Sequence, residues 1–317
     1  MNAWQLPEGI DELTHDQALT FEMLRRSLID LYTSKGFGLV IPPMVEYVDS
    51  LLLTSDSVNE KTFKFLDPVS GKMLGVHADI TPQIARIDAR RANNTIEKYC
   101  YINAILQTSA DDFYDSRSPI QAGAELYGAD DISADVEIIE LMLESLKLLS
   151  IDPIVISLGN VAIFDALINQ ASLTNLQAAE LRQIFTRRSS PDLAVFIANN
   201  SVANASAFSA LMKLEGNSPI LEQALDLFSE YPQALSAIKD LQAIDEKLQA
   251  KGIQATYDLA ELKTYEYHTG VVFSAYNQNY SKALAKGGRY NGIGESFGRS
   301  RAATGFSFDL KFLSQSK

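Results

Sequence analysis

The feature that most constrains the fold is a change in residue pattern along the chain, from strand-like to helical and back to strand-like. Helical spacing dominates residues 160–251, and amphipathic helices are also expected at 15–35 and 133–149. Strand-like runs lie on both sides of the helical stretch, at residues 37–41, 99–106, 121–127 and 153–158 before it and at 253–259, 270–276 and 281–287 after it. This order predicts an α+β fold in which one antiparallel core domain, residues 1–159 and 252–317, is interrupted by a helical insertion at 160–251.

The C-terminal segment 285–313 is rich in glycine and reads AKGGRYNGIGESFGRSRAATGFSFDLKFL. Glycines at this density mark backbone that adopts positive φ or that lies close to a ligand or another strand. An isolated pair of glycines would indicate a hairpin loop. The order GGRYNG followed by GFSFDLKFL is more specific than such a loop.

Length and charge limit the classes of partner. A chain of 317 residues is long enough for about two domains with cores of their own. The net charge is −13, and basic residues form no cluster larger than a pair, such as Arg90–Arg91 and Arg187–Arg188. Because nucleic-acid binding depends on Lys and Arg that neutralise phosphates, we expect no nucleic-acid partner.

The single cysteine, Cys100, lies in the apolar run YCYINAIL, so we expect a buried thiol and neither a disulfide nor a cysteine metal site. The N-terminus lacks the basic start and apolar core of a signal peptide, and no apolar run approaches the ~20 residues of a membrane helix. We therefore expect a cytoplasmic protein that contacts no membrane and holds no metal or cofactor.

The segment QAGAELYG (121–128) alternates between two faces of a predicted strand. Gln121, Gly123 and Glu125 share one face, opposite Ala122, Ala124 and Leu126. Such a polar face is either exposed to solvent, which is the commoner arrangement, or lines a polar cavity. The central glycine favours the cavity, because it opens space between two long polar side chains.

Two further segments add candidate binding residues. In GVHADITPQIARI, Thr81 is a candidate N-cap and Pro82 a candidate first residue of a helix, which would place Asp79 near the helix N-terminus; capping alone would explain Thr81. In LKTYEYHTGVVF, Tyr267 and His268 lie beside an acid, and His268 lacks the neighbours of a metal motif. Acids, an amide and aromatic rings together suit a small cationic or zwitterionic ligand such as an amino acid.

These motifs occur in the order found in histidyl-tRNA synthetase, and the resemblance runs from about residue 5 to 317, weakest in the helical insertion. IPPMVEY (41–47) resembles class II motif 1, which implies a self-dimer through this region. VHADITPQIAR resembles the segment that holds the substrate ammonium, QAGAELYG the end of motif 2, and TYEYHTGVVF and GGRYNG the two histidine-specific segments. The resemblance implies a class II synthetase-like sheet flanked by helices, and a histidine site made of Asp79, Thr81, Gln107, Gln121, Glu125, Lys263, Tyr267 and His268.

The sequence departs from the synthetase pattern on the ATP side. The positions of three family arginines carry Gln107 in motif 2, Lys263 in the histidine-specific segment and Lys311 in motif 3. A lysine keeps the charge of arginine but loses its bidentate planar fork. Adenylation depends on such cationic groups around the phosphates, so we expect no catalytic residue in this chain.

Two more departures indicate the same loss. The motif 2 loop (108–120) carries Asp111, Asp112 and Asp115 against Arg117, and these carboxylates would repel a triphosphate. The sequence given ends soon after motif 3, so we also expect no anticodon-binding domain.

A histidine pocket kept in outline without its ATP clamp is similar to one family, the regulatory subunits of ATP phosphoribosyltransferase, whose characteristic strings include YHTGVVF and TPQIAR. The resemblance implies a subunit that acts in the first step of L-histidine biosynthesis. It would form a hetero-oligomer, expected to be a hetero-octamer, with a short-form catalytic subunit. It would activate that subunit and mediate feedback inhibition with L-histidine as the effector.

Two alternatives stay open from the sequence. One is an active, truncated histidyl-tRNA synthetase-like ligase, which would catalyse ATP–pyrophosphate exchange in the presence of histidine. The other is a stand-alone amino-acid sensor, which would form no complex with a short-form catalytic subunit.

Overall fold

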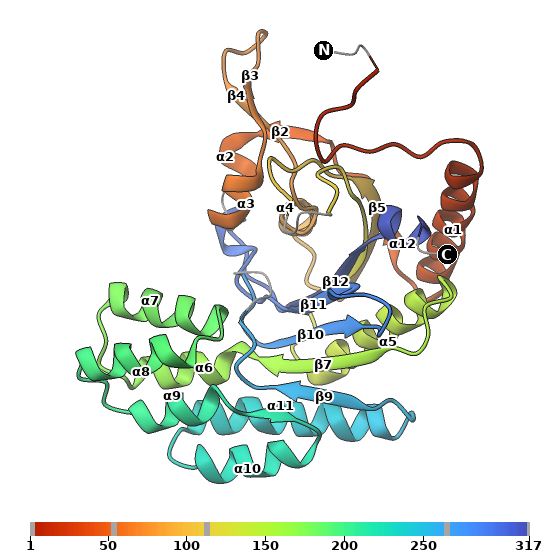
Figure 1. Ribbon diagram of the computed structural model, residues 1–317. Helices are drawn as coiled ribbons and strands as arrows, with labels where there is room; N and C mark the ends of the chain where they lie inside the picture. Colours follow the sequence, from red (N-terminus) through yellow and green to blue (C-terminus); the bar gives the residue numbers. More distant parts are fainter. Residues whose placement is uncertain (1–3, 52–55, 111–114, 263–266, 316–317) are drawn as a thin grey trace. The chain divides into compact units, whose positions relative to one another are not determined.

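The computed structural model describes residues 4–51, 56–110, 115–262 and 267–315, which form two compact units. The first unit comprises Met1–Ala129, Glu140–Asp152 and Asn291–Lys317, and the second comprises Asp130–Ile139 and Pro153–Tyr290. Each unit contains its own strands and helices (Figure 1).

The main strands of the first unit follow the order β1-β5-β6-β12. They are β1 (Gly38–Leu39), β5 (Glu97–Ala104), β6 (Ile120–Tyr127) and β12 (Ala303–Asp309). β5, β6 and β12 are antiparallel, whereas β1 is parallel to β5. The alternation of small apolar and polar residues in β6 is what allows both of its faces to pack.

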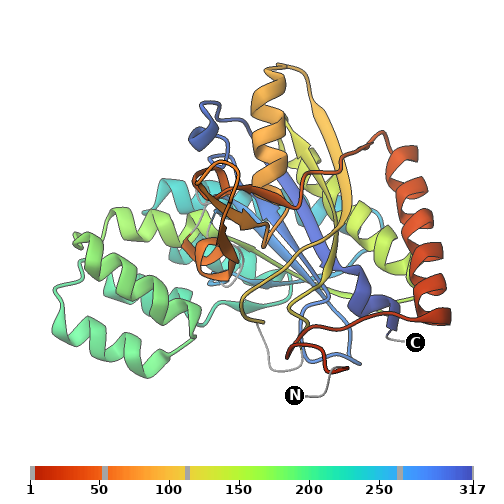
Figure 2. The same ribbon diagram turned by 90° about the horizontal axis from the view of Figure 1, so that it is seen from above.

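Helices of the first unit include α1 (His15–Ser34) and α12 (Leu310–Gln315), which lie side by side in both views (Figures 1 and 2). The apolar spacing of α1 buries Leu28 and Tyr32. α4 (Thr81–Arg91) has a proline at its start. The residues of α5 (Ile132–Leu148) are divided between the two units, and η1 (Glu295–Phe297) precedes β12.

A small antiparallel sheet in the first unit, in the order β2-β4-β3, was not predicted from the sequence. Its strands and the adjoining helices are β2 (Val45–Tyr47), α2 (Val48–Leu51), α3 (Asp56–Lys61), β3 (Lys64–Leu66) and β4 (Met73–Val76). The strands are too short and too exposed to show the alternation by which a strand is recognised.

The second unit contains strands in the order β11-β10-β7-β9-β8. They are β7 (Val155–Asn160), β8 (Glu215–Gly216), β9 (Ala255–Asp258), β10 (Val271–Tyr276) and β11 (Ala285–Arg289). The helices between β7 and β9 are α6 (Val161–Asn169), α7 (Asn175–Thr186), α8 (Ser190–Asn199), α9 (Ala205–Leu211), α10 (Pro219–Leu227) and α11 (Pro232–Gln249). α11 packs on α6 and β7, and the rings of Phe164, Phe185 and Phe208 meet in the helical core.

The predicted α+β class with a mostly antiparallel sheet and a helical stretch is therefore confirmed, although β1 pairs with β5 and β7 with β9 in parallel. Residues 160–251 contain helices α6 to α11. That this stretch forms a domain of its own stays a prediction. Cys100 is buried, as expected, and burial raises the pKa of its thiol to about 12. Within the described ranges, no helix combines the length and hydrophobicity needed to cross a bilayer.

Candidate functional site

The polar face of β6 is buried inside the first unit. Gln121 is 6 % exposed and Glu125 is 1 % exposed. These values exclude the solvent-exposed sheet face that the sequence left as the commoner alternative. The face is therefore a buried polar surface, on which uncompensated polar groups would be costly.

Gly123 allows a tyrosine of the neighbouring strand to lie against the backbone of β6. Tyr101 on β5 pairs with Gly123, and a Cβ at Gly123 would lie 2.6 Å from the Tyr101 hydroxyl oxygen and 2.5 Å from the Phe306 carbonyl oxygen. The expectation that this glycine leaves open space between Gln121 and Glu125 is wrong, because the ring of Tyr101 occupies that space.

Asp79 connects β6 to the start of α4. One of its carboxylate oxygens, Oδ1, accepts a hydrogen bond from Gln121 Nε2 at 2.9 Å and another from the backbone N–H of Thr81 at 3.4 Å. The N-cap residue of α4 is Ile80, so the prediction of Thr81 as N-cap is wrong by one residue. The short side chain of Asp79 bonds the first turn instead, as acidic residues commonly do at helix starts.

Gln107 joins the same neighbourhood. Its Nε2 donates to the carbonyl oxygen of Ala78 at 3.0 Å, directly before Asp79. Asp79, Gln107 and Gln121 thus meet around the start of α4, where Thr81 is also buried, and Glu125 lies further along the same face of β6.

Tyr267 and His268 lie in the second unit, in a cluster of rings with Tyr290. The ring centroid of Tyr267 is 5.3 Å from that of His268 and 5.6 Å from that of Tyr290, and both contacts are edge-to-face. Burial lowers the pKa of His268 to about 3, so this imidazole is neutral near pH 7. A neutral imidazole among phenol rings is suited to a planar aromatic ligand.

The GGRYNG segment supports this cluster from β11. A Cβ at Gly288 would lie 3.0 Å from His268 Nε2 and 2.6 Å from the Val271 carbonyl oxygen, so only glycine allows the ring this close. Arg289 donates to the carboxylate of Asp135 through Nε at 3.1 Å and Nη2 at 2.7 Å. Gly288 and Arg289 of this segment therefore pack and anchor the second unit.

Sequence reasoning overlooked three tyrosines at these sites, Tyr101, Tyr127 and Tyr290. Each reads as an ordinary core aromatic. The one available signal was spacing, because Tyr127 follows Glu125 by two residues and so shares its face of β6. Lys263 lies outside the described residues.

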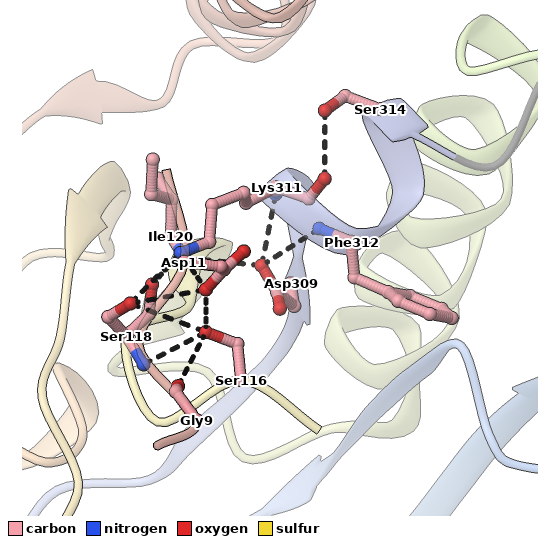
Figure 3. A network of polar contacts seen from close by, with 9 residues as sticks. All are labelled: Gly9, Asp11, Ser116, Ser118, Ile120, Asp309, Lys311, Phe312 and Ser314. Carbon is pink, nitrogen blue, oxygen red and sulfur yellow. Dashed lines mark hydrogen bonds and ion pairs between the residues drawn. The ribbon is translucent and has the colours of Figure 1, made fainter. Parts of the chain in front are cut away.

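Lys311 forms a closed polar cluster with the N-terminal segment and the loop before β6 (Figure 3). Its ammonium donates to Asp11 Oδ1 at 2.8 Å, to Ser118 Oγ at 3.1 Å and to the Ser118 carbonyl oxygen. Ser116 and Ser118 also donate to Asp11. Because an ammonium has three N–H groups, these acceptors account for all of them.

The acids in this cluster respond oppositely to their surroundings. Burial raises the pKa of Asp11, but hydrogen bonds from Lys311 and Ser116 and the charge of Lys311 outweigh it, so the net pKa lies below the ordinary value. Burial dominates at Asp309 and raises its pKa. Asp309 Oδ1 accepts the backbone N–H of Lys311 at 3.0 Å and so caps α12.

Comparisons with known proteins agree with this fold. A family model described as histidyl-tRNA synthetase matches residues 9–313. The crystal structure of an ATP phosphoribosyltransferase regulatory subunit/histidyl-tRNA synthetase from Bacillus halodurans C has a TM-score of 0.89 and 23 % identity, covering 100 % of this chain and 83 % of that one. The fold and the buried polar face of β6 thus define a histidyl-tRNA synthetase-like protein.

Relatives with higher sequence identity show which family within this class the chain belongs to. A protein of Thiobacillus denitrificans named ATP phosphoribosyltransferase regulatory subunit is 42 % identical over 315 residues, covering 99 % of this chain and 98 % of the relative. One of the same name from Methylococcus capsulatus is 43 % identical, covering 98 % of this chain and 78 % of the relative. The chain belongs to the family of ATP phosphoribosyltransferase regulatory subunits.

Proposed function

We propose that the chain is a regulatory subunit of ATP phosphoribosyltransferase with no catalytic activity of its own. It assembles with the short-form catalytic subunit in a hetero-oligomer, expected to be a hetero-octamer, and activates it. It also transmits feedback inhibition by L-histidine, in the cytoplasm and without a cofactor. The names of the curated relatives support this assignment.

The proposed effector is L-histidine. Its ligands are the residues implied by the resemblance, Asp79, Thr81, Gln107, Gln121, Glu125, Lys263, Tyr267 and His268. The buried carboxylates of Asp79 and Glu125 suit an ammonium group, since charged hydrogen bonds are the strong ones. The rings around His268 suit an imidazole.

The observation that carries the non-catalytic role is the closed cluster of Lys311. This lysine stands at the motif 3 position, where the synthetase family has an arginine for ATP. All three of its N–H groups are directed at Asp11 and Ser118. A cation committed in this way cannot also hold a phosphate, which supports a protein that binds histidine without activating it.

Regulation requires that histidine bind two states of the complex with different affinity. The coupling free energy between such sites is typically ~1–3 kcal/mol, equivalent to roughly 5- to 150-fold in affinity. Where histidine changes the affinity of the complex for a substrate, that substrate must change the histidine affinity by the same factor.

The self-dimer proposed for the motif 1 region (41–47) would use an exposed apolar surface of the first unit. Ile41, Met44 and Tyr47 are exposed apolar side chains on or beside β2. Glu46 is held on the inner side by Arg86 Nε at 3.0 Å and by Gln83 Nε2 at 2.7 Å. An exposed apolar edge on an ordered support is suited to association with a second copy.

Two assays on the full chain test the proposed function. Adding the chain to a short-form catalytic subunit should raise its turnover, and L-histidine should then inhibit the complex. ATP–pyrophosphate exchange with histidine should be absent. Robust exchange would identify an active ligase, and the absence of any complex would favour a stand-alone sensor.

A further inference from the structure

We propose that Tyr127 is a positioning residue that orients Glu125 in the histidine site, and that Gln121, besides its proposed contact with histidine, orients Asp79. This inference rests on the proposed binding of L-histidine and assigns a role to Tyr127 that no motif gave it. Both positioning residues come from β6, the strand that also carries Glu125.

The contact of Tyr127 with Glu125 is direct and buried. The phenol hydroxyl donates to Glu125 Oε2 at 3.0 Å, and both residues are almost fully enclosed. The ring of Tyr127 is itself restrained, because Tyr99 packs edge-to-face against it with centroids 5.8 Å apart. Tyr99 is the strand partner of Glu125 on β5, so strand pairing brings the whole group together.

The contacts of Gln121 lead to the same conclusion for Asp79. Its Nε2 donates to Asp79 Oδ1 at 2.9 Å, and its Oε1 accepts the backbone N–H of Ile80 at 3.1 Å. The nitrogen and the oxygen of the side-chain amide therefore both form hydrogen bonds with the loop that precedes α4. Besides its proposed contact with histidine, Gln121 thus holds Asp79 in place.

A carboxylate that is already oriented binds a ligand more tightly in a buried site. A carboxylate that must meet a cationic ligand loses binding free energy if it first has to be oriented, so a fixed neighbour improves affinity without touching the ligand. Tyr127 provides this effect for Glu125.

The test is calorimetric titration of the full-length protein with L-histidine. Tyr127→Phe keeps the ring and removes only the hydroxyl, so the fold should persist, as circular dichroism and thermal unfolding would check. We expect roughly tenfold weaker binding. Because Tyr127 acts through Glu125, the variant with both Tyr127→Phe and Glu125→Gln should bind no more weakly than Glu125→Gln alone.

A matched control separates positioning from stability. Tyr257 is a buried tyrosine of the second unit whose hydroxyl donates to Asp245 Oδ1 at 2.6 Å, so Tyr257→Phe removes the same kind of bond elsewhere. It should leave the affinity for histidine unchanged.

The outcomes distinguish the inference from the proposed function. If the wild type binds L-histidine and Glu125→Gln weakens binding but Tyr127→Phe does not, the positioning role is overturned and the proposed function stands. Additive losses from Tyr127→Phe and Glu125→Gln would also overturn it. A wild type that binds no histidine would overturn the proposed function and this inference together.

Discussion

Replacing Lys311 with methionine removes the ammonium while keeping an unbranched side chain of similar length. The change leaves the Asp11 carboxylate and two oxygens of Ser118 without their shared donor. It therefore separates the N-terminal segment and the loop before β6 from α12. We expect a loss of stability and earlier proteolysis of the N-terminal segment.

The size of the effect follows from burial. Lys311 is 6 % exposed, whereas the Asp11 side chain is 41 % exposed and can be hydrated once its partner is gone. A hydrogen bond to a charged group contributes typically ~1.5–3 kcal/mol, while an exposed ion pair contributes ~0.2–1 kcal/mol. The expected loss for Lys311→Met is about 2 kcal/mol, in the lower part of the range for charged hydrogen bonds, because one partner is buried and the other is partly exposed.

The measurement is urea unfolding at pH 7, with Lys35→Met as the matched control. Lys35 pairs with Glu144 at 2.7 Å, a distance close to that of Lys311 with Asp11, but Lys35 is 45 % exposed. The control should therefore lose about 0.5 kcal/mol or less. Equal effects of the two substitutions would refute the claim that Lys311 closes a buried cluster.

The pH dependence gives a second check on the same variant. The pKa of Asp11 is lowered in the folded state, so its contribution is present above the ordinary value of 3.8 and is lost as the pH falls through the lower folded value. The difference between wild type and Lys311→Met should shrink below about pH 3.8.

Three further predictions concern groups whose burial the structure defines. The pKa of His268 is lowered from 6.5 to about 3, so the unfolded chain gains a proton first as the pH falls. Between pH 7 and pH 5 this should remove about 2 kcal/mol of stability, a component that His268→Gln lacks in urea unfolding. Arg289→Met leaves the buried carboxylate of Asp135 without its cationic partner and should lower the free energy of unfolding by about 3–5 kcal/mol. The control Arg182→Met removes an exposed ion pair and should lower it by less than about 1 kcal/mol; thermal unfolding measures both. Gly123→Ala places a methyl group 2.5 Å from a backbone oxygen and should lower the free energy of unfolding by about 1–3 kcal/mol or more. In the control Gly216→Ala the nearest neighbour lies at 4.0 Å, so calorimetry should show unfolding like that of the wild type.

The strands and helices that the sequence predicted are those with a clear periodic residue pattern. β6 has strict alternation, and α1 begins at His15 and ends at Ser34 much as its apolar spacing indicates. The ends of the helices and strands were harder to predict from the sequence. The run at 281–287 begins four residues before β11, whose paired residues start at Ala285. Strands such as β8, with two residues, carry no periodic signal at all.

The candidate site was predictable where local motifs carry it and not where distant residues meet. Asp79, Gln121 and Glu125 belong to short motifs, and the hydrogen bond between Asp79 and Gln121 joins residues only 42 positions apart in the sequence. The partners of Lys311 could not be predicted, because Asp11 lies 300 positions earlier in the sequence. Nothing local distinguishes a lysine that closes a cluster from one that binds a ligand.

The chemistry of lysine explains why this residue, and not arginine, suits position 311. An ammonium has three N–H groups in a compact head, and the cluster offers it three acceptors, one on Asp11 and two on Ser118. An arginine has five donors in a rigid plane, so at least two would point away from these acceptors and towards any anion nearby. The substitution that closes the cluster thus removes the donors that a phosphate would need. In the protein that we propose, Lys311 stabilises the N-terminal segment and directs its N–H groups at Asp11 and Ser118 instead of at a nucleotide phosphate.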